Sequence, residues 1–79
     1  MAIAYVLLSC DLGSENSIIE QLKAIPSVKE VLGIFGAYDI LVKVESSSAD
    51  ELRETVTFKI RKISAVRSTL TLTCIEGQE

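Results

Sequence analysis

The chain has 79 residues, of which 48% are hydrophobic and 24% are charged, and its formal net charge is −3 at pH 7. These values predict one small folded domain, because disordered chains are far more polar and a second core would need a longer chain. With no histidine, the sequence excludes a Ser–His–Asp or Cys–His nucleophile and a histidine metal site, and its acidic balance argues against direct binding of nucleic acid.

The first predicted element is a strand over residues 2–10, a continuous apolar run that is typical of a strand covered on both faces. A helix follows, because Ser17 and Glu20 have the spacing of a capping box. Apolar residues at helical spacing form one stripe on it: Ile18, Leu22 and Ile25. Pro26 ends this helix, since a proline disfavours the helical conformation in the residue before it.

The next two predicted elements are strands, because residues 28–35 and 38–45 carry alternating apolar positions. Gly36 and Ala37 lie between them, and so short a connection predicts a hairpin with a tight turn. These two strands should therefore be antiparallel neighbours.

A second helix is predicted where Ser48 and Glu51 repeat the capping-box spacing. Its apolar stripe consists of Leu52, Val56, Ile60 and Ile63. Acidic residues occupy its first turns and basic residues its end, which complements the helix dipole. We therefore interpret the basic cluster as dipole complement and solvated surface rather than as a phosphate site: Lys59, Arg61 and Lys62.

The last predicted strand covers residues 65–75, which alternate strictly. One face is expected to carry Val66, Ser68, Leu70, Leu72 and Cys74. The other is expected to carry Arg67, Thr69, Thr71, Thr73 and Ile75.

The order of these elements predicts a single α+β domain over residues 1–79 with the ferredoxin-like βαββαβ arrangement. Its sheet has four antiparallel strands, and both helices lie on one face. Cys10 and Cys74 then lie at opposite ends of the sheet, too far apart for a disulfide, so we interpret both as small buried hydrophobic residues.

The helices leave the other face of the sheet bare. Apolar residues expected on it are Ile3, Tyr5, Leu7, Val31, Phe35 and Leu41. Soluble monomers avoid such patches, and the mean hydropathy of +0.37 is high for so short a chain. We therefore expect a sheet-to-sheet isologous dimer, a dimeric α+β barrel.

The sequence shows no sign of membrane insertion or export. Its longest uncharged apolar run, residues 2–8, is far shorter than the roughly 20 residues that a bilayer requires. No basic region precedes this run and no cleavage site follows it. We therefore expect a cytoplasmic protein.

Asp39 follows the predicted turn and has two interpretations. It could cap the turn by accepting a hydrogen bond from a nearby N–H. It could instead present its carboxylate to the ammonium group of a ligand, beside unpaired backbone N–H groups. The residues alone leave both open.

The threonine row of the last strand, Thr69, Thr71 and Thr73, also has two interpretations. Threonine favours strands, so the row fits a half-exposed edge face. Its hydroxyls could instead hydrogen-bond the carboxylate or a polar side chain of a small ligand. Ser68 lies on the opposite face.

From residue 3 to about residue 76, the chain resembles the C-terminal ligand-binding (RAM) domain of the Lrp/AsnC transcription regulators. The segments that carry the resemblance are AYVLL, LKAIPSVKEV, GAYDILVKV, ELRETVTFKIRKI and AVRSTLTLTCIE. The Gly-x-Tyr-Asp hairpin followed by the Thr-x-Thr strand is its most specific part. One departure is Ala65, where the family usually has glycine before Val66.

The resemblance implies a non-enzymatic regulatory module that binds a free amino acid and needs no cofactor. The ligand-binding residues that it implies are Gly36, Ala37, Tyr38, Asp39, Ser68, Thr69 and Thr71. The loop backbone and the Asp39 carboxylate would hold the α-amino and α-carboxylate groups, and the strand hydroxyls would help to select the side chain.

The resemblance also implies partners, because family members pair sheet to sheet, often form rings of four dimers, and bind the amino acid between dimers. Met1 leads directly into the first strand without the usual helix-turn-helix domain, so we expect a stand-alone form that modulates full-length Lrp/AsnC regulators. The alternative is a pure oligomerisation module without a ligand. An enzyme is disfavoured, because the sequence offers no histidine and no evident buried carboxylate pair.

Overall fold

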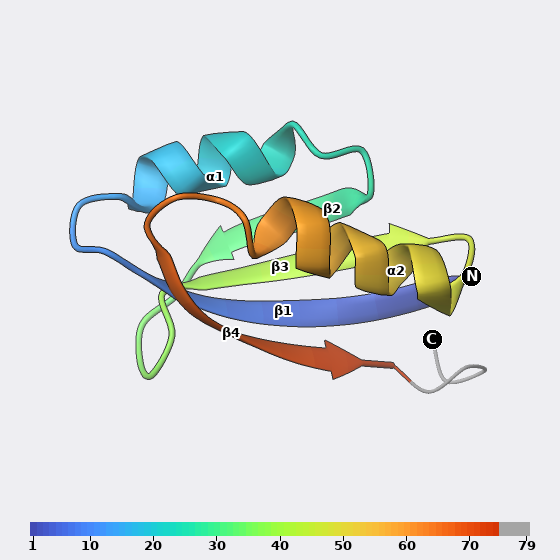
Figure 1. The fold of residues 1–79 in the computed structure, drawn as a ribbon. Helices are drawn as coiled ribbons and strands as arrows, with labels where there is room; N and C mark the ends of the chain where they lie inside the picture. The colour runs from blue at the N-terminus through green and yellow to red at the C-terminus, as the bar shows by residue number, and fades with distance from the viewer. Residues whose placement is uncertain (75–79) are drawn as a thin grey trace.

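The computed structural model describes residues 1–74 and confirms the predicted order of elements (Figure 1). The elements are β1 (Ala2–Cys10), α1 (Glu15–Lys23), β2 (Val28–Gly33), β3 (Ile40–Ser46), α2 (Ala49–Thr55), the π-helical turn η1 (Val56–Ile60) and β4 (Val66–Thr73). The predicted position of Ile75 lies outside the described residues.

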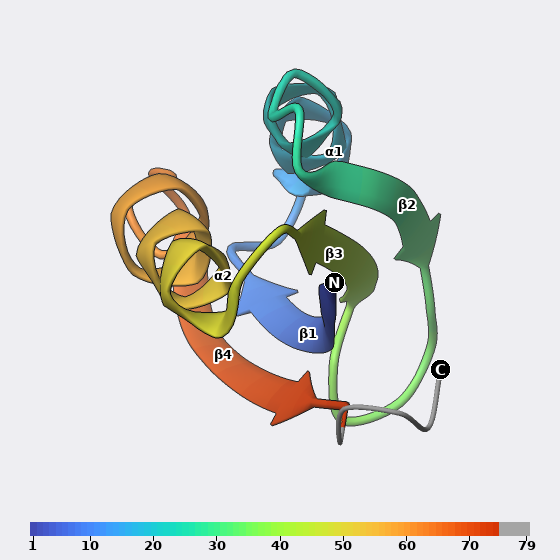
Figure 2. The same ribbon diagram turned by 90° about the vertical axis from the view of Figure 1, so that its right-hand side faces the viewer.

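The four strands form one antiparallel sheet in the order β2-β3-β1-β4, with both helices on the same face (Figure 2). This is the ferredoxin-like arrangement that the sequence predicts. Cys10 pairs with Val66 at one end of the sheet, whereas the Cys74 amide donates to the Ile3 carbonyl at the other end (2.9 Å). Both cysteines are free thiols, as expected, and both are half-buried rather than buried.

The core lies between the sheet and the two helices, and the predicted apolar stripes of both helices are buried in it. The sheet contributes Ala4, Val6, Leu8, Ile40, Val42 and Val44, all with no exposed surface. These residues alternate along β1 and β3, because successive side chains of a strand point to opposite faces.

The two helix starts differ from each other. The prediction that Ser17 caps α1 is wrong: Ser14 is the N-cap residue and makes no side-chain capping bond, and Ser17 lies inside the helix. At α2 the prediction is confirmed, because the Ser48 hydroxyl accepts a hydrogen bond from the Glu51 amide (3.2 Å). The Glu51 carboxylate completes this start by accepting from Ser47 (2.7 Å).

The connection between β2 and β3 is a six-residue loop, residues 34–39, rather than the predicted tight turn at Gly36 and Ala37. The Ile34 amide donates to the Asp39 carbonyl and closes the loop (2.9 Å). Phe35 is therefore not a strand residue, and its side chain is fully exposed.

A bulge at the start of β4 corrects the predicted face of Val66, whereas the alternation predicted from Ser68 to Thr73 is confirmed. Cys10 pairs with Val66 and Ser9 pairs with Ser68, so Arg67 is an extra residue on β4. Val66 consequently packs against the core, while Ser68 lies on the opposite face beside Ser9.

A similar shift in β2, between Val28 and Glu30, corrects the predicted face of Val31. Val31 pairs with the buried Val42 and packs against the core, so it does not belong to the open face. The open face does carry apolar side chains across the sheet: Tyr5, Leu7, Leu32, Leu41, Leu70 and Leu72. Leu32, Leu70 and Leu72 are exposed, so the described chain leaves this face uncovered.

Ala65 occupies the turn before β4 with φ of 76°, a left-handed conformation that favours glycine. It is the position at which the resemblance predicts a glycine. The turn keeps its left-handed conformation all the same, and the Asp11 amide donates to the Ala65 carbonyl (2.9 Å).

Candidate functional site

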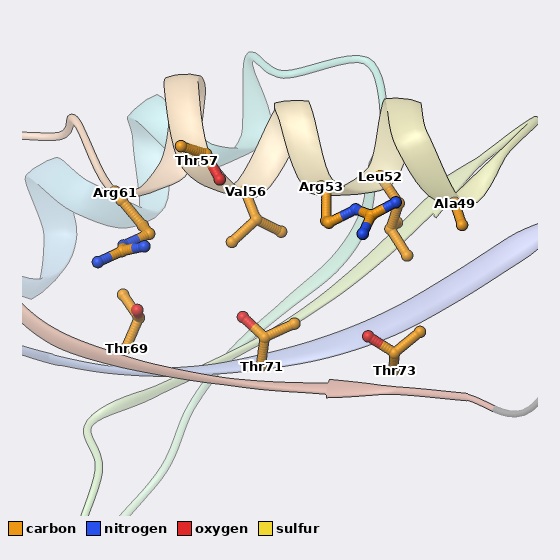
Figure 3. Close-up of a pocket in the computed structure, with 9 residues that line it drawn as sticks. All are labelled: Ala49, Leu52, Arg53, Val56, Thr57, Arg61, Thr69, Thr71 and Thr73. Atoms are coloured by element: carbon orange, nitrogen blue, oxygen red, sulfur yellow. The ribbon is translucent and has the colours of Figure 1, made fainter.

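The predicted site residues fall into two places in the structure. Gly36, Ala37, Tyr38 and Asp39 belong to the loop at the end of the sheet where β1 ends and β3 begins. Thr69 and Thr71 lie on the helix side of β4, opposite α2 (Figure 3).

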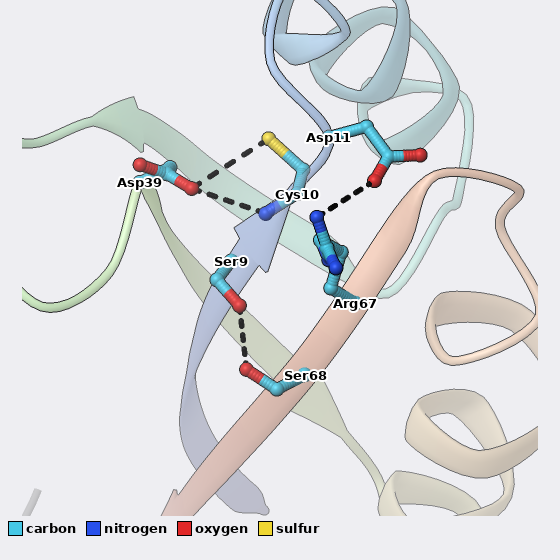
Figure 4. Close-up of polar contacts among 6 residues, drawn as sticks. All are labelled: Ser9, Cys10, Asp11, Asp39, Arg67 and Ser68. Atoms are coloured by element: carbon cyan, nitrogen blue, oxygen red, sulfur yellow. Dashed lines mark hydrogen bonds and ion pairs between the residues drawn. The ribbon is translucent and has the colours of Figure 1, made fainter.

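Asp39 joins the loop to the end of β1. Its backbone amide donates to the Leu8 carbonyl (2.8 Å), and its Oδ2 accepts a hydrogen bond from the Cys10 amide (3.0 Å) (Figure 4). The Asp39 side chain therefore caps the end of β1 by accepting from the Cys10 amide, and it does not cap the turn of its own loop. Oδ1 has no hydrogen-bond partner among residues 1–74, so the carboxylate keeps an acceptor for a further group.

The Cys10 thiol points at the same carboxylate oxygen, with 3.8 Å between Sγ and Oδ2. Burial raises the pKa of the Cys10 thiol, and the adjacent negative charge of Asp39 raises this pKa further. A thiol held neutral in this way is a weak nucleophile. Cys10 is accordingly a structural residue beside the candidate site.

Ser68 lies at the same end of the sheet as the loop, on the open face. Its hydroxyl hydrogen-bonds that of Ser9 (2.5 Å), and the neighbouring Arg67 forms an exposed ion pair with Asp11 (3.5 Å) (Figure 4). The structure thus separates Ser68 from Thr69 and Thr71, which the sequence also places on opposite faces.

A shallow pocket of about 400 Å³ lies between the loop and the start of α1. It is lined by Glu15, Gly33, Ile34, Phe35 and Asp39. Its two titratable side chains are both carboxylates, so the pocket favours a cationic group such as an ammonium.

A larger cleft of about 530 Å³ lies between the α2–η1 helix and β4 (Figure 3). It is lined by Ala49, Leu52, Arg53, Val56, Thr57, Arg61, Thr69, Thr71 and Thr73. The cleft exists because α2 packs over β1 and β3 and leaves the edge strand β4 uncovered. The threonine row is therefore the lining of a cleft, with Thr71 and Thr73 exposed.

The sequence interpretation did not single out Arg53 and assigned Arg61 to solvated surface, yet both arginines line this cleft. Arg53, Thr57 and Arg61 recur at intervals of four residues, which places them along one side of the helix. This four-residue spacing is the sequence signal that groups the two arginines on one side of the helix. It does not show that this side faces the threonine row of β4. Lys59 and Lys62 do not line the cleft.

Two other kinds of site can be assessed on the described residues. Residues 1–74 contain no group of three or more histidine, cysteine, aspartate or glutamate side chains that could hold a metal ion. No helix in that part of the chain is long and apolar enough to cross a membrane.

Comparison with known proteins gives a family match over nearly the whole chain. The family model of the Lrp/AsnC ligand binding domain matches residues 3–77. The crystal structure of a hypothetical protein from Pyrococcus horikoshii is 37% identical, with a TM-score of 0.90, and the match covers 95% of this chain and 90% of that one.

Curated relatives include homocitrate synthases. The one from Sulfurisphaera tokodaii is 47% identical over 56 residues, 71% of this chain, and the one from Saccharolobus islandicus is 42% identical over 69 residues, 86% of this chain. The chain spans only 12% and 15% of the length of these two proteins.

A more distant neighbour shares the fold alone. The crystal structure of a transcriptional regulator from Neisseria meningitidis in complex with L-Met has a TM-score of 0.86 at 11% identity. The match covers 99% of this chain and 52% of that regulator.

Proposed function

The chain belongs to the family of Lrp/AsnC ligand-binding domains, and from this premise we propose that it is a non-enzymatic sensor of free amino acids that acts as an oligomer. The homocitrate synthases match over too small a part of their length to bring their reaction to this chain. The regulator bound to L-Met supports an amino acid as the class of ligand, although its likeness is one of fold.

The observation that carries the proposal is the Asp39 carboxylate at the loop end. Oδ2 is held by the Cys10 amide, which fixes the carboxylate, and Oδ1 has no partner among the described residues. Glu15 lines the same pocket and adds negative charge. An α-ammonium group is the part of an amino acid that such a pocket would bind, and we propose that the backbone of residues 36–38 and Ser68 hold the α-carboxylate.

In a single chain the loop and the threonine row belong to different pockets. We therefore propose that Thr69 and Thr71 reach the amino acid only when a second copy lies against the loop. This fits a site at the contact between dimers, with the dimers themselves formed through the open face of the sheet. A ligand at that contact would favour one assembly over another and so alter regulators that join it.

The experiment is thermal unfolding at fixed protein concentration with each of the twenty common amino acids in turn. A ligand at about 100 times its Kd stabilises the fold by about 2.7 kcal/mol, which raises Tm by several degrees. The variant Asp39→Asn keeps an oxygen for the Cys10 amide and removes the charge, and it should lose most of the response. Glu20→Gln, an equal charge change on the exposed side of α1, should keep it.

Two results would count against the proposal in different ways. If no amino acid raises Tm, the chain is an oligomerisation module and not a sensor. If an amino acid raises Tm equally in the parent and in Asp39→Asn, the sensor stands but the site is not at the loop.

A further inference from the structure

The open face of the sheet carries an ion pair among its apolar side chains. Lys43 and Glu45 alternate with the buried Val42 and Val44 on β3, so they belong to this face. The Lys43 ammonium lies 3.7 Å from the Glu45 carboxylate, and the two side chains are 26% and 22% exposed. The two other ion pairs of residues 1–74 join side chains that are more than half exposed. Among the described residues, this is the ion pair that the fold holds mostly out of water.

The strand register places this pair within the uncovered apolar surface. Lys43 pairs with Tyr5 on β1, and Tyr5 pairs in turn with the exposed Leu72 on β4. Glu45 pairs with Ile3, the next residue of β1 on the same face. A partner that covers Tyr5 and Leu72 would therefore take the ion pair further out of water.

The two charged groups have capacity for further partners. Their separation of 3.7 Å is longer than a hydrogen bond, and neither group forms a hydrogen bond within residues 1–74. Glu30 lies opposite Lys43 on β2, but it is exposed and forms no ion pair with it. Burying charges without hydrogen-bond partners is unfavourable. A wholly apolar partner would leave Lys43 and Glu45 in that state, whereas a partner with an ammonium and a carboxylate of its own would not.

A second copy of the chain brings both charges in the required arrangement. In an isologous pair, contact of Lys43 with Glu45 of the second copy implies the reciprocal contact as well. Where the two β3 strands face each other in opposite directions, both contacts form if the two-fold axis passes beside residue 44. A shift of the axis by one residue would bring two Lys43 or two Glu45 side chains together. Only one register therefore matches the charges.

We propose that Lys43 and Glu45 are the self-recognition element of the dimer. Each Lys43 pairs with Glu45 of the second copy, which fixes the register of the two sheets and selects another copy of this chain over a partner with an apolar face. The inference rests on the open-face dimer of the proposed function and goes beyond it, because the leucines of this face supply contact area without selecting a partner.

The test exchanges the charges. Lys43→Glu and Glu45→Lys each place like charges against each other twice in a homodimer, so each should raise the dimer Kd at least tenfold. In an equimolar mixture the two variants should form a heterodimer with a Kd within about threefold of the parent value, because both contacts then join opposite charges. Sedimentation with a fluorescent label on one variant distinguishes this heterodimer from either homodimer.

Glu20→Lys and Lys62→Glu are the matched control pair. They make the same changes of net charge at exposed positions outside the open face. Their mixture should associate no more tightly than either variant alone, since exposed charges outside the interface act only through a screened field. An equal preference for the heterodimer in this control would assign the effect to net charge and overturn the proposal.

Neutral variants keep the test valid if a charge exchange prevents folding. Lys43→Gln and Glu45→Gln each leave one covered charge without its partner, so each should weaken the dimer, and the double variant should weaken it no more than either single one. Additive losses would contradict the proposal, as would charge-exchange variants that dimerise like the parent or a mixture that gives no heterodimer. If Leu70→Thr weakens the dimer while the charge variants do not, the open-face dimer stands and this inference alone fails.

Discussion

Strands β3 and β4 flank β1 on its two sides, yet the sequence uses their helix-facing positions differently. In β3 these positions are Ile40, Val42 and Val44, all fully buried. In β4 only Val66, at its start, packs against the core, and the later helix-facing positions are threonines that line an open cleft. The difference follows from helix placement, because α2 packs over β1 and β3 and not over the edge strand. Apolar residues therefore mark the covered part of this sheet face, and hydroxyls mark the part that stays accessible.

The largest expected effect is on the free energy of unfolding, which a substitution in β3 should lower far more than one in β4. Ile40→Ala leaves a cavity in the covered part, and we expect the free energy of unfolding to fall by about 2–5 kcal/mol. Thr71→Ala removes a side chain from the open cleft and should cost less than about 1 kcal/mol, mainly through strand propensity. Urea unfolding at one protein concentration measures both. Equal losses would mean that β4 is packed as tightly as β3.

The second effect concerns the opposite face of the sheet, where β4 carries the exposed Leu70 and Leu72 and β3 carries the half-buried Leu41. Leu70 is 42% exposed, and burying the remainder against a second copy is worth about 1 kcal/mol per copy. In an isologous dimer the residue counts twice, so Leu70→Thr should raise the dimer Kd about thirtyfold. Analytical ultracentrifugation over a dilution series measures this Kd.

Leu12→Thr is the matched control for this prediction. Leu12 is 98% exposed but lies in the turn after β1, away from the open sheet face. It should leave the Kd unchanged. If the two variants weaken the dimer equally, or if the parent chain sediments as a monomer at all concentrations, the open face is not the dimer interface.

Sequence periodicity predicted the covered part of the molecule well, because burial imposes a repeat on the residues themselves. Ile18 and Leu22 on α1, and Leu52 and Val56 on the second helix, are buried as their spacing indicates. The extra residue Arg67 in β4 leaves no such repeat, so the face of Val66 could not be assigned from alternation alone, whereas that of Ser68 was predicted correctly.

The candidate sites were predictable only in part, for a related reason. The Asp39 position after the hairpin indicated a special role, but its contact with Cys10 joins residues 29 positions apart in the sequence. The cleft is likewise a product of tertiary packing, since Arg61 and Thr69 line it together only because α2 packs over β1 and β3 and leaves space beside β4. Such sites depend on where elements lie and not on the pattern within one element.

The smallest expected effect on stability concerns the segments that precede β3 and β4. β3 follows a loop held by Asp39, whereas β4 follows Ala65 in a left-handed conformation with φ of 76°. That conformation costs a non-glycine residue about 1–2 kcal/mol, whereas glycine loses about 0.4–1 kcal/mol through the flexibility of the unfolded chain. Ala65→Gly should therefore stabilise the fold by about 0.5–1 kcal/mol and raise Tm by about 3–6 °C. Ala37→Gly in the β2–β3 loop, where φ is not positive, should lower Tm slightly. If both substitutions lowered Tm, Ala65 would not be strained in the turn before β4. The two segments that precede β3 and β4 would then respond to glycine in the same way.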